Sequence, residues 1–232
     1  ENIQILKKAG SSVNREAVLI KDGVIKGFGS EAIQNAKRLK IKPKKAKNLL
    51  LAPCLVDPHS FLESPFNCKA ENIYTLIEKA KFSGYGQLGI LPRSNVWRDQ
   101  IESIIALKTI KSEVLIHIWG GFSINGKGLT LSNHAELLRK GAIGLSDDDY
   151  MPPIELLKQG FSLREMKNSP VLFAPRDKSL QAGGMSRQSV ETLRAGWPLD
   201  PVESETIPLI QLVELHKQYP EITLRLMNIS TA

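Results

Sequence analysis

The feature that most constrains this chain is a regular alternation of short apolar runs with helical periods, which starts at residue 53 and continues to residue 232. Between the first two runs, Ile73, Leu76, Ile77 and Ala80 occupy positions i, i+3, i+4 and i+7, the spacing of one helix face. Strands that alternate with helices imply a parallel sheet flanked by helices. The runs predict six strands, over residues 55–57, 87–91, 114–119, 142–145, 171–174 and 222–229.

Two α/β architectures contain such a sheet, and the chain favours one of them. A (β/α)8 barrel needs eight units and about 250 residues before any added domain, whereas residues 53–232 supply about six units. A doubly wound open sheet places a Gly-x-Gly-x-x-Gly turn after its first strand, and this sequence has no such turn there. We therefore expect an incomplete barrel.

The first 52 residues differ from the rest of the chain. They predict short strands over residues 3–6, 16–21, 23–27 and 49–51, with Asp22-Gly23 as a tight hairpin turn. A basic run lies between the last two of these strands, formed by Lys37, Arg38, Lys40, Lys42, Lys44, Lys45 and Lys47. Such a run can bind phosphate or nucleic acid, or it can be a solvated loop between two strands. No aromatic residue interleaves for base stacking, which favours the loop, and we do not expect nucleic acid as a partner.

Composition excludes further classes of protein. The 31 Lys and Arg against 24 Asp and Glu give a formal net charge of +7, within ordinary globular composition. No stretch approaches the about 20 consecutive apolar residues of a membrane helix, and the first residues lack the apolar core of a secretory leader. The two cysteines, Cys54 and Cys68, cannot build a disulfide framework. We therefore expect a cytoplasmic protein without a membrane partner.

The four histidines carry different expectations. His59 directly follows the first barrel strand, and the carboxyl ends of barrel strands are where functional side chains gather. His117 lies within an apolar run and is expected in the core, whereas His134 and His216 are expected on helix surfaces. No glycine-flanked serine forms a nucleophile elbow, which disfavours a Ser-His hydrolase.

Several segments resemble a known family. Residues 51–59, LAPCLVDPH, resemble the "LAPGLVDPHVHLREP" signature of the amidohydrolase superfamily, and within it of the long, multidomain dihydroorotases. Residues 141–148 resemble the family's "GAVAFSDD", and residues 230–232 match the end of its "HVSTA". The resemblance implies an amidohydrolase-type (β/α)8 TIM barrel. Residues 1–52 would be part of a small β-sandwich domain, and residues 53–232 the first six or so units of the barrel.

The resemblance also implies where a zinc centre would stand and shows that most of it is replaced. At the family's second strand-one histidine this chain has Phe61, at the strand-five histidine Ala174, and at the strand-six histidine Asn228. His59 and Asp147 keep their family types, as residual metal positions. Zinc needs three or four N, O or S ligands, so we expect low metal occupancy and no cofactor, although the family binds zinc.

The family's carboxylate anchor is replaced as well. An arginine after the His-x-His pair and an asparagine after strand two hold the substrate carboxylate in the family. The matching residues here are Glu63 and Arg93, and both follow neighbouring strands. Because one is an anion and the other a cation, we expect them to face the old pocket within ion-pair or one-water reach. Arg176 is a competing cation for Glu63.

These replacements predict a dihydroorotase-like protein that is catalytically inactive. It would act as a structural or regulatory partner in pyrimidine biosynthesis, with aspartate transcarbamoylase catalytic chains or a homo-oligomer as the assembly that the resemblance suggests. The alternative is an active, metal-dependent cyclic amidohydrolase, a dihydroorotase with a rebuilt site.

Overall fold

The computed structural model describes residues 1–166 and 168–231. Its contacts divide the chain into two compact units, Glu1–Leu55 and Val56–Ala232. The boundary expected from the sequence lies after residue 52. Each unit is described by itself below. In the part of the chain that the structure describes, no helix is both long and apolar enough to cross a membrane.

The first unit is built from short strands and one helix. A three-stranded sheet has the order β2-β1-β5, formed by β1 (Ile3–Ile5), β2 (Asn14–Glu16) and β5 (Leu50–Leu51). A hairpin joins β3 (Val18–Lys21) to β4 (Val24–Phe28), and its two turn residues, Asp22 and Gly23, both have positive φ as that tight turn requires.

A helix that the sequence did not predict follows the hairpin. This helix, α1 (Gly29–Arg38), has Glu31 in its first turn and Lys37 with Arg38 in its last turn. Those charges oppose the partial charges at the two helix ends and stabilise it. The basic run therefore begins inside a helix, whereas its later lysines lie in the loop before β5.

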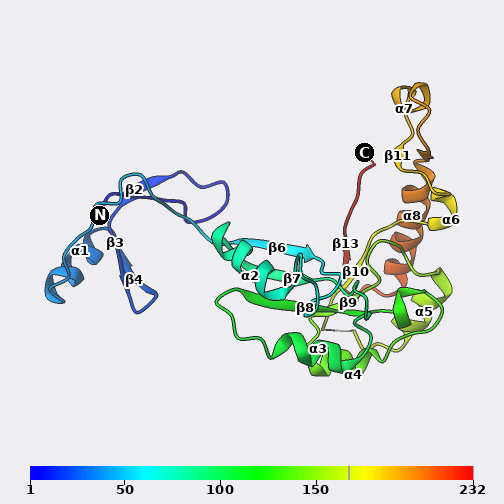
Figure 1. Ribbon diagram of the computed structural model, residues 1–232, viewed down its shortest axis with the longest axis horizontal. Coiled ribbons are helices and arrows are strands. Elements are labelled where there is room, and N and C mark those ends of the chain that lie inside the picture. Colours follow the sequence, from blue (N-terminus) through cyan, green and yellow to red (C-terminus); the bar gives the residue numbers. More distant parts are fainter. Residues whose placement is uncertain (167, 232) are drawn as a thin grey trace. The chain divides into compact units, whose positions relative to one another are not determined.

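The second unit contains the predicted parallel sheet. Six strands lie in the order β13-β10-β9-β8-β7-β6, which confirms an α/β half-barrel (Figure 1). The strands are β6 (Leu55–Ser60), β7 (Tyr85–Ile90), β8 (Leu115–Gly121), β9 (Gly144–Ser146), β10 (Val171–Phe173) and β13 (Leu224–Leu226). The helices between them are α2 (Ile73–Phe82), α3 (Ile101–Lys108), α4 (His134–Lys140), α5 (Ile154–Ser162) and α8 (Glu203–Gln218).

Local chemistry explains where these helices begin and end. Asn72 caps α2 by accepting hydrogen bonds from the backbone N–H groups of Tyr74 and Thr75, and Thr75 completes a capping box. The end of α4 is Gly141, whose φ of 111° is a left-handed conformation that favours glycine. Their apolar faces pack on the sheet in one core cluster, which includes Ile73, Ile104 and Leu137.

An excursion of residues 178–202 interrupts the alternation between β10 and α8, and the sequence did not predict its elements. It contains α6 (Lys178–Gln181), β11 (Ser186–Arg187), α7 (Val190–Arg194) and β12 (Leu199–Asp200). In Figure 1 it is coloured yellow to orange and extends beyond α8 to α7. The two short strands pair in parallel and form the base of this excursion.

Candidate active site

The register of the parallel strands brings the sequence-predicted site positions to one edge of the sheet. Gly121 pairs with Ser146, Ser146 with Leu172, and Phe173 with Leu226. The residues that follow these strands are therefore neighbours. We call this edge the barrel mouth; it contains His59, Arg93, Asp147, Ala174 and Asn228.

The side chain of Asp147 accepts hydrogen bonds from the turn after β8. Its side chain is buried, and its two carboxylate oxygens accept hydrogen bonds from the backbone N–H of Ser123 at 2.8 Å and from the Ser123 hydroxyl at 2.5 Å. The Ser123 hydroxyl in turn accepts from the N–H of Gly128. Burial raises the pKa of Asp147 to about 6, although the hydrogen bonds from Ser123 oppose that shift. The carboxylate thus fixes the turn after β8.

Arg93 is the centre of a charged cluster. Its Nε lies 2.8 Å from Oδ2 of Asp148, a contact with the length of an ion pair but without the alignment of a hydrogen bond, and its Nη1 donates to Asp149. The guanidinium also lies over the ring of Phe61, 4.1 Å from its centroid. The residue at the family's second histidine position is therefore part of this cluster.

The prediction of an ion pair between Glu63 and Arg93 is wrong. Among the described residues, the ion-pair partners of Arg93 are Asp148 and Asp149, which come from the loop after β9. The reason lies in the backbone: Asp148 has a φ of +63° and its N–H donates to the Ser146 hydroxyl, which turns this loop toward Arg93. Glu63 is exposed.

Asp148 is the buried member of the cluster. Only 2% of its side chain is exposed. Burial raises the pKa of Asp148 to about 6 and the charge of Asp149 adds to the shift, whereas Arg93 and Arg98 oppose it. The cluster therefore contains one carboxyl group, that of Asp148, which is harder to ionise than usual and is held by a cation of the protein itself.

His59 lies at the end of β6 and is half-buried. Its backbone N–H donates to Asp57 at 3.0 Å, and the Ser60 hydroxyl donates to the same carboxylate. Burial lowers the pKa of the His59 imidazole; Asp57 opposes this shift and Arg225 adds to it. The lowered pKa favours the neutral imidazole, which is the form that can bind a metal ion or accept a proton.

The side chains at the mouth offer few ligand atoms for a zinc ion. Phe61 and Ala174 offer no ligand atom, and both oxygens of Asp147 are already engaged by Ser123. Within residues 1–166 and 168–231, no three His, Cys, Asp or Glu side chains lie close enough together to hold a metal ion. Since zinc requires three or four convergent ligands, the described side chains do not fit a zinc site.

Two residues near the mouth, Arg98 and His134, are buried although their sequence context does not predict it. Arg98 is 1% exposed, and nothing in its sequence context indicates burial. His134, expected on a helix surface, is fully buried, with its Nε2 2.7 Å from the carbonyl oxygen of Phe122. Being the first residue of α4, it points back onto Phe122, the residue after β8, rather than outward. His117 is half-buried, and its Nε2 contacts Gln87.

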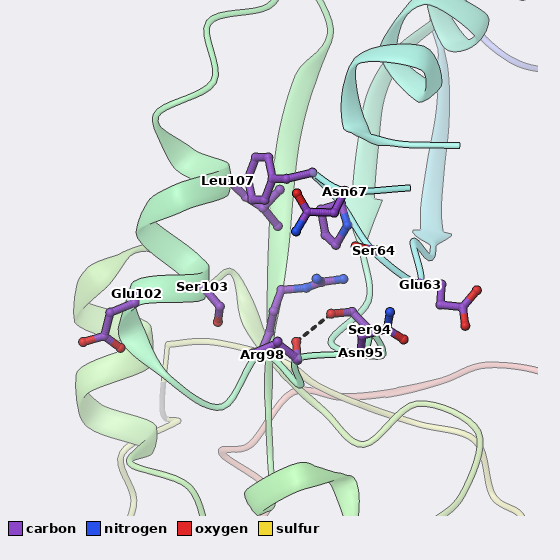
Figure 2. Close-up of a pocket in the computed structure, with 12 residues that line it drawn as sticks. Glu63, Ser64, Asn67, Ser94, Asn95, Arg98, Glu102, Ser103 and Leu107 are labelled. Carbon is purple, nitrogen blue, oxygen red and sulfur yellow. Dashed lines mark hydrogen bonds between the residues drawn. The ribbon is translucent and has the colours of Figure 1, made fainter. Parts of the chain in front are cut away.

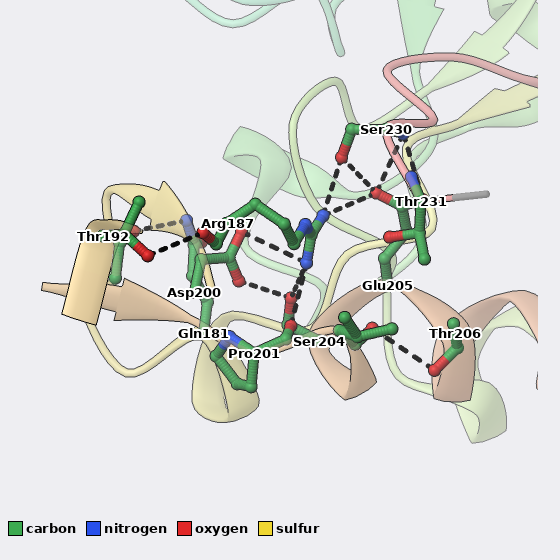
Figure 3. Close-up of polar contacts among 12 residues, drawn as sticks. Gln181, Arg187, Thr192, Asp200, Pro201, Ser204, Glu205, Thr206, Ser230 and Thr231 are labelled. Carbon is green, nitrogen blue, oxygen red and sulfur yellow. Dashed lines mark hydrogen bonds and ion pairs between the residues drawn. The ribbon is translucent and has the colours of Figure 1, made fainter. Parts of the chain in front are cut away.

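A second polar cluster joins the excursion and α8 to the segment after β13 that resembles the family's "HVSTA" (Figure 3). Arg187, on β11, pairs with Glu205 of α8 at 2.8 Å and with Asp200 of β12 at 3.5 Å. Glu205 also accepts hydrogen bonds from the backbone N–H groups of Ser230 and Thr231 after β13. This cluster fixes the excursion to the segment that follows the last described strand.

The fold is that of a partial amidohydrolase barrel. The structure superimposes on the L-hydantoinase (dihydropyrimidinase) of Arthrobacter aurescens with a TM-score of 0.66 at 14% identity, covering 99% of this chain and 52% of that one. No family model matches the chain.

In sequence the chain is similar to proteins named dihydroorotase or dihydroorotase-like, as the resemblance predicted. It is 28% identical over 210 residues to a probable dihydroorotase-like protein of Synechocystis sp., and 26% identical over 208 residues to a dihydroorotase of Elusimicrobium minutum. These matches cover 80% and 88% of this chain but 47% of each relative. The chain therefore spans about half the length of the curated relatives it matches.

The comparisons correct one expectation. We expected no cofactor, and the matches contradict this, because the relatives named dihydroorotase and the hydantoinase are zinc-binding, metal-dependent amidohydrolases.

Proposed function

We propose that this dihydroorotase-type cyclic amidohydrolase homologue does not hydrolyse dihydroorotate. In this proposal it acts as a structural or regulatory partner in pyrimidine biosynthesis. The observation that carries the proposal is the cluster in which Arg93 is held by Asp148 and Asp149 above the ring of Phe61.

The cluster opposes substrate binding in two ways. A substrate carboxylate that approaches Arg93 must displace two carboxylates that the fold already holds there, one of them 2% exposed. Glu63, at the other anchor position, would repel the substrate. Two positions that would bind metal in the family are also apolar here, Phe61 and Ala174. Loss of the anchor and loss of ligand side chains both reduce the hydrolytic rate.

The test is dihydroorotate hydrolysis by the full-length protein, with Zn²⁺ supplied so that a weak site is filled. A working dihydroorotase serves as the positive control, and His59→Ala as the matched variant. We expect the same rate as in a blank without enzyme for both the wild type and His59→Ala. Turnover by the wild type that His59→Ala abolishes would overturn the proposal.

The assembly is tested separately by sedimentation of the full-length protein alone and with aspartate transcarbamoylase catalytic chains. A complex with those chains supports the partner that the family resemblance suggests, and a homo-oligomer alone supports the other assembly. A protein that stays monomeric and does not bind those chains would contradict both assemblies.

An active amidohydrolase with a rebuilt site is the second candidate. The observation in its favour is that Asp147 and Asp148 are two adjacent buried carboxyl groups whose pKa values are both raised to about 6, as suits a general acid or base. In that case Asp148→Asn would abolish hydrolysis of some cyclic amide, for which dihydroorotate, dihydrouracil and hydantoin are the first substrates to assay.

A further inference from the structure

A pocket of about 310 Å³ lies beside the barrel mouth, and the proposed function makes no use of it (Figure 2). Its lining comes from three places: residues 63–67 after β6, residues 94–96 and Arg98 after β7, and the helix α3. The pocket therefore lies between α3, in the layer of helices, and the loops that follow β6 and β7; we call this place the flank of the half-barrel. The strand-end residues of β8, β9, β10 and β13 are not part of its lining.

The guanidinium of Arg98 is the one cation among the residues that line this pocket. The residue is 1% exposed, and its Nε and Nη2 donate to the carbonyl oxygen of Leu91, with a longer bond from Nη2 to the carbonyl oxygen of Arg93 at 3.4 Å. Its Nη1 makes no hydrogen bond to any described residue. Nor does a described carboxylate lie within ion-pair distance of Arg98, so the buried cation lacks a direct counterion.

A buried charge without a counterion is costly. Backbone carbonyls compensate part of that cost for Arg98, and the charge of Asp148 acts on it from beyond ion-pair distance. Burial lowers the pKa of Arg98 to about 10, which still leaves the guanidinium charged at neutral pH. An anion bound in the pocket would supply the counterion that the Arg98 guanidinium lacks.

The other lining side chains complement an anion that has an apolar body. The hydroxyls of Ser94 and Ser103 already donate to backbone carbonyls, whereas the side chains of Ser64, Asn67 and Asn95 donate to no described residue. Phe66, Val96 and Leu107 supply the apolar wall.

The two acidic residues of the lining do not oppose this assignment. Figure 2 shows that the carboxylates of Glu63 and Glu102 point outward at opposite rims, while the guanidinium of Arg98 points into the group of lining residues. The negative charges therefore lie at the rim and the positive charge lies inside. In this arrangement the anionic group of a bound ligand would lie at Arg98, away from the two rim carboxylates.

We infer that this pocket binds a small organic monocarboxylate, with its carboxylate at Nη1 of Arg98 and its apolar body against Phe66 and Leu107. Charge-assisted hydrogen bonds to a guanidinium are among the strong ones, and the volume is at the lower end of small-molecule sites. The inference goes beyond the proposed function, because it concerns a ligand of the flank and not the substrate of the mouth.

The probes are sodium benzoate and its neutral isostere benzamide, added to the full-length protein and followed by titration calorimetry and thermal unfolding. Asn67→Asp places a carboxylate in the lining without changing its shape, on an exposed loop where folding should tolerate it. Asn35→Asp, on α1, makes the same change of net charge outside the pocket. Arg98→Met removes the cation.

We expect benzoate to bind with a Kd in the millimolar range and to raise the Tm, whereas benzamide binds at least about tenfold more weakly. Asn67→Asp and Arg98→Met should lose benzoate binding by about tenfold or more, and Asn35→Asp should retain it. Should Arg98→Met fail to fold, Asn67→Asp decides alone. Equal binding of benzoate and benzamide, no binding of benzoate to the wild type, or full binding by Asn67→Asp would each overturn the inference.

Discussion

Replacing Arg187 by methionine removes the cation of the cluster at the base of the excursion. Methionine keeps most of the length and apolar stem of the side chain, so the change isolates the guanidinium. Arg187 is 25% exposed, whereas its two anionic partners, Glu205 and Asp200, are 2% and 8% exposed. The substitution therefore leaves two buried carboxylates without their positive partner.

The expected loss in the free energy of unfolding depends on the hydrogen bonds that the two carboxylates retain. Breaking a buried ion pair by removing one partner costs about 3–5 kcal/mol. Glu205 retains the donors of Ser230 and Thr231, and Asp200 retains the hydroxyl of Ser204 at 2.5 Å. The loss in the free energy of unfolding should thus be near the lower limit, about 3 kcal/mol.

Urea denaturation followed by circular dichroism measures the loss, and hydrogen exchange shows whether β11 and the first turn of α8 open locally. Arg194→Met, on the exposed face of α7, is the matched control and should change the free energy of unfolding by less than about 0.5 kcal/mol. Asp200→Asn keeps its bond from Ser204 and should cost about 1 kcal/mol or less. If Arg187→Met costs no more than Arg194→Met, the cluster does not hold the excursion and the reasoning is refuted.

The remaining predictions concern a histidine, two glycines and the mouth. Burial lowers the pKa of His134, so the unfolded state binds a proton more readily than the folded state. The free energy of unfolding should therefore fall as the pH drops below about 6.5. His134→Gln should reduce this pH dependence in urea titrations from pH 7.5 to 5, and an unchanged pH dependence would contradict the prediction. Gly89→Ala places Cβ 2.3 Å from the carbonyl oxygen of Pro58 and should cost about 2 kcal/mol or more, whereas Gly27→Ala, with 3.6 Å to its nearest neighbour, should be neutral in the same melts. Phe61→His alone should leave dihydroorotate hydrolysis at the blank rate with Zn²⁺ present, and any gain in rate would show that a partial ligand set is enough.

Periodicity alone was sufficient to predict the half-barrel. Each barrel strand is a short apolar run bounded by polar or turn residues, and each main helix shows an apolar face at helical spacing, so the predicted elements of the second unit are confirmed within a few residues. The exceptions are the short elements of the excursion, such as α7, in which no residue is buried. A segment held by polar contacts has no apolar period to detect.

The candidate site was harder to predict because side-chain partners depend on how loops turn. Strand ends correctly placed Arg93 and Asp147 at one edge of the sheet. The partner of Arg93 depends on a left-handed residue, Asp148, which sequence spacing does not reveal. The burial of Arg98 and His134 likewise depends on backbone carbonyls, those of Leu91 and Phe122, which carry no signature in the sequence.

The strand order of the half-barrel has a consequence for biosynthesis. From β6 to β10 every strand lies beside the strand that precedes it in the chain, and β13 joins β10 as the next strand of the sheet. A ribosome releases these strands in the same order, so each can dock on an edge that already exists, and none must wait for a later one. The excursion is different, because Arg187 binds Ser230, which is translated 43 residues later. While those residues emerge, the base of the excursion lacks part of its cluster, so it is among the last parts of the described barrel to become fixed.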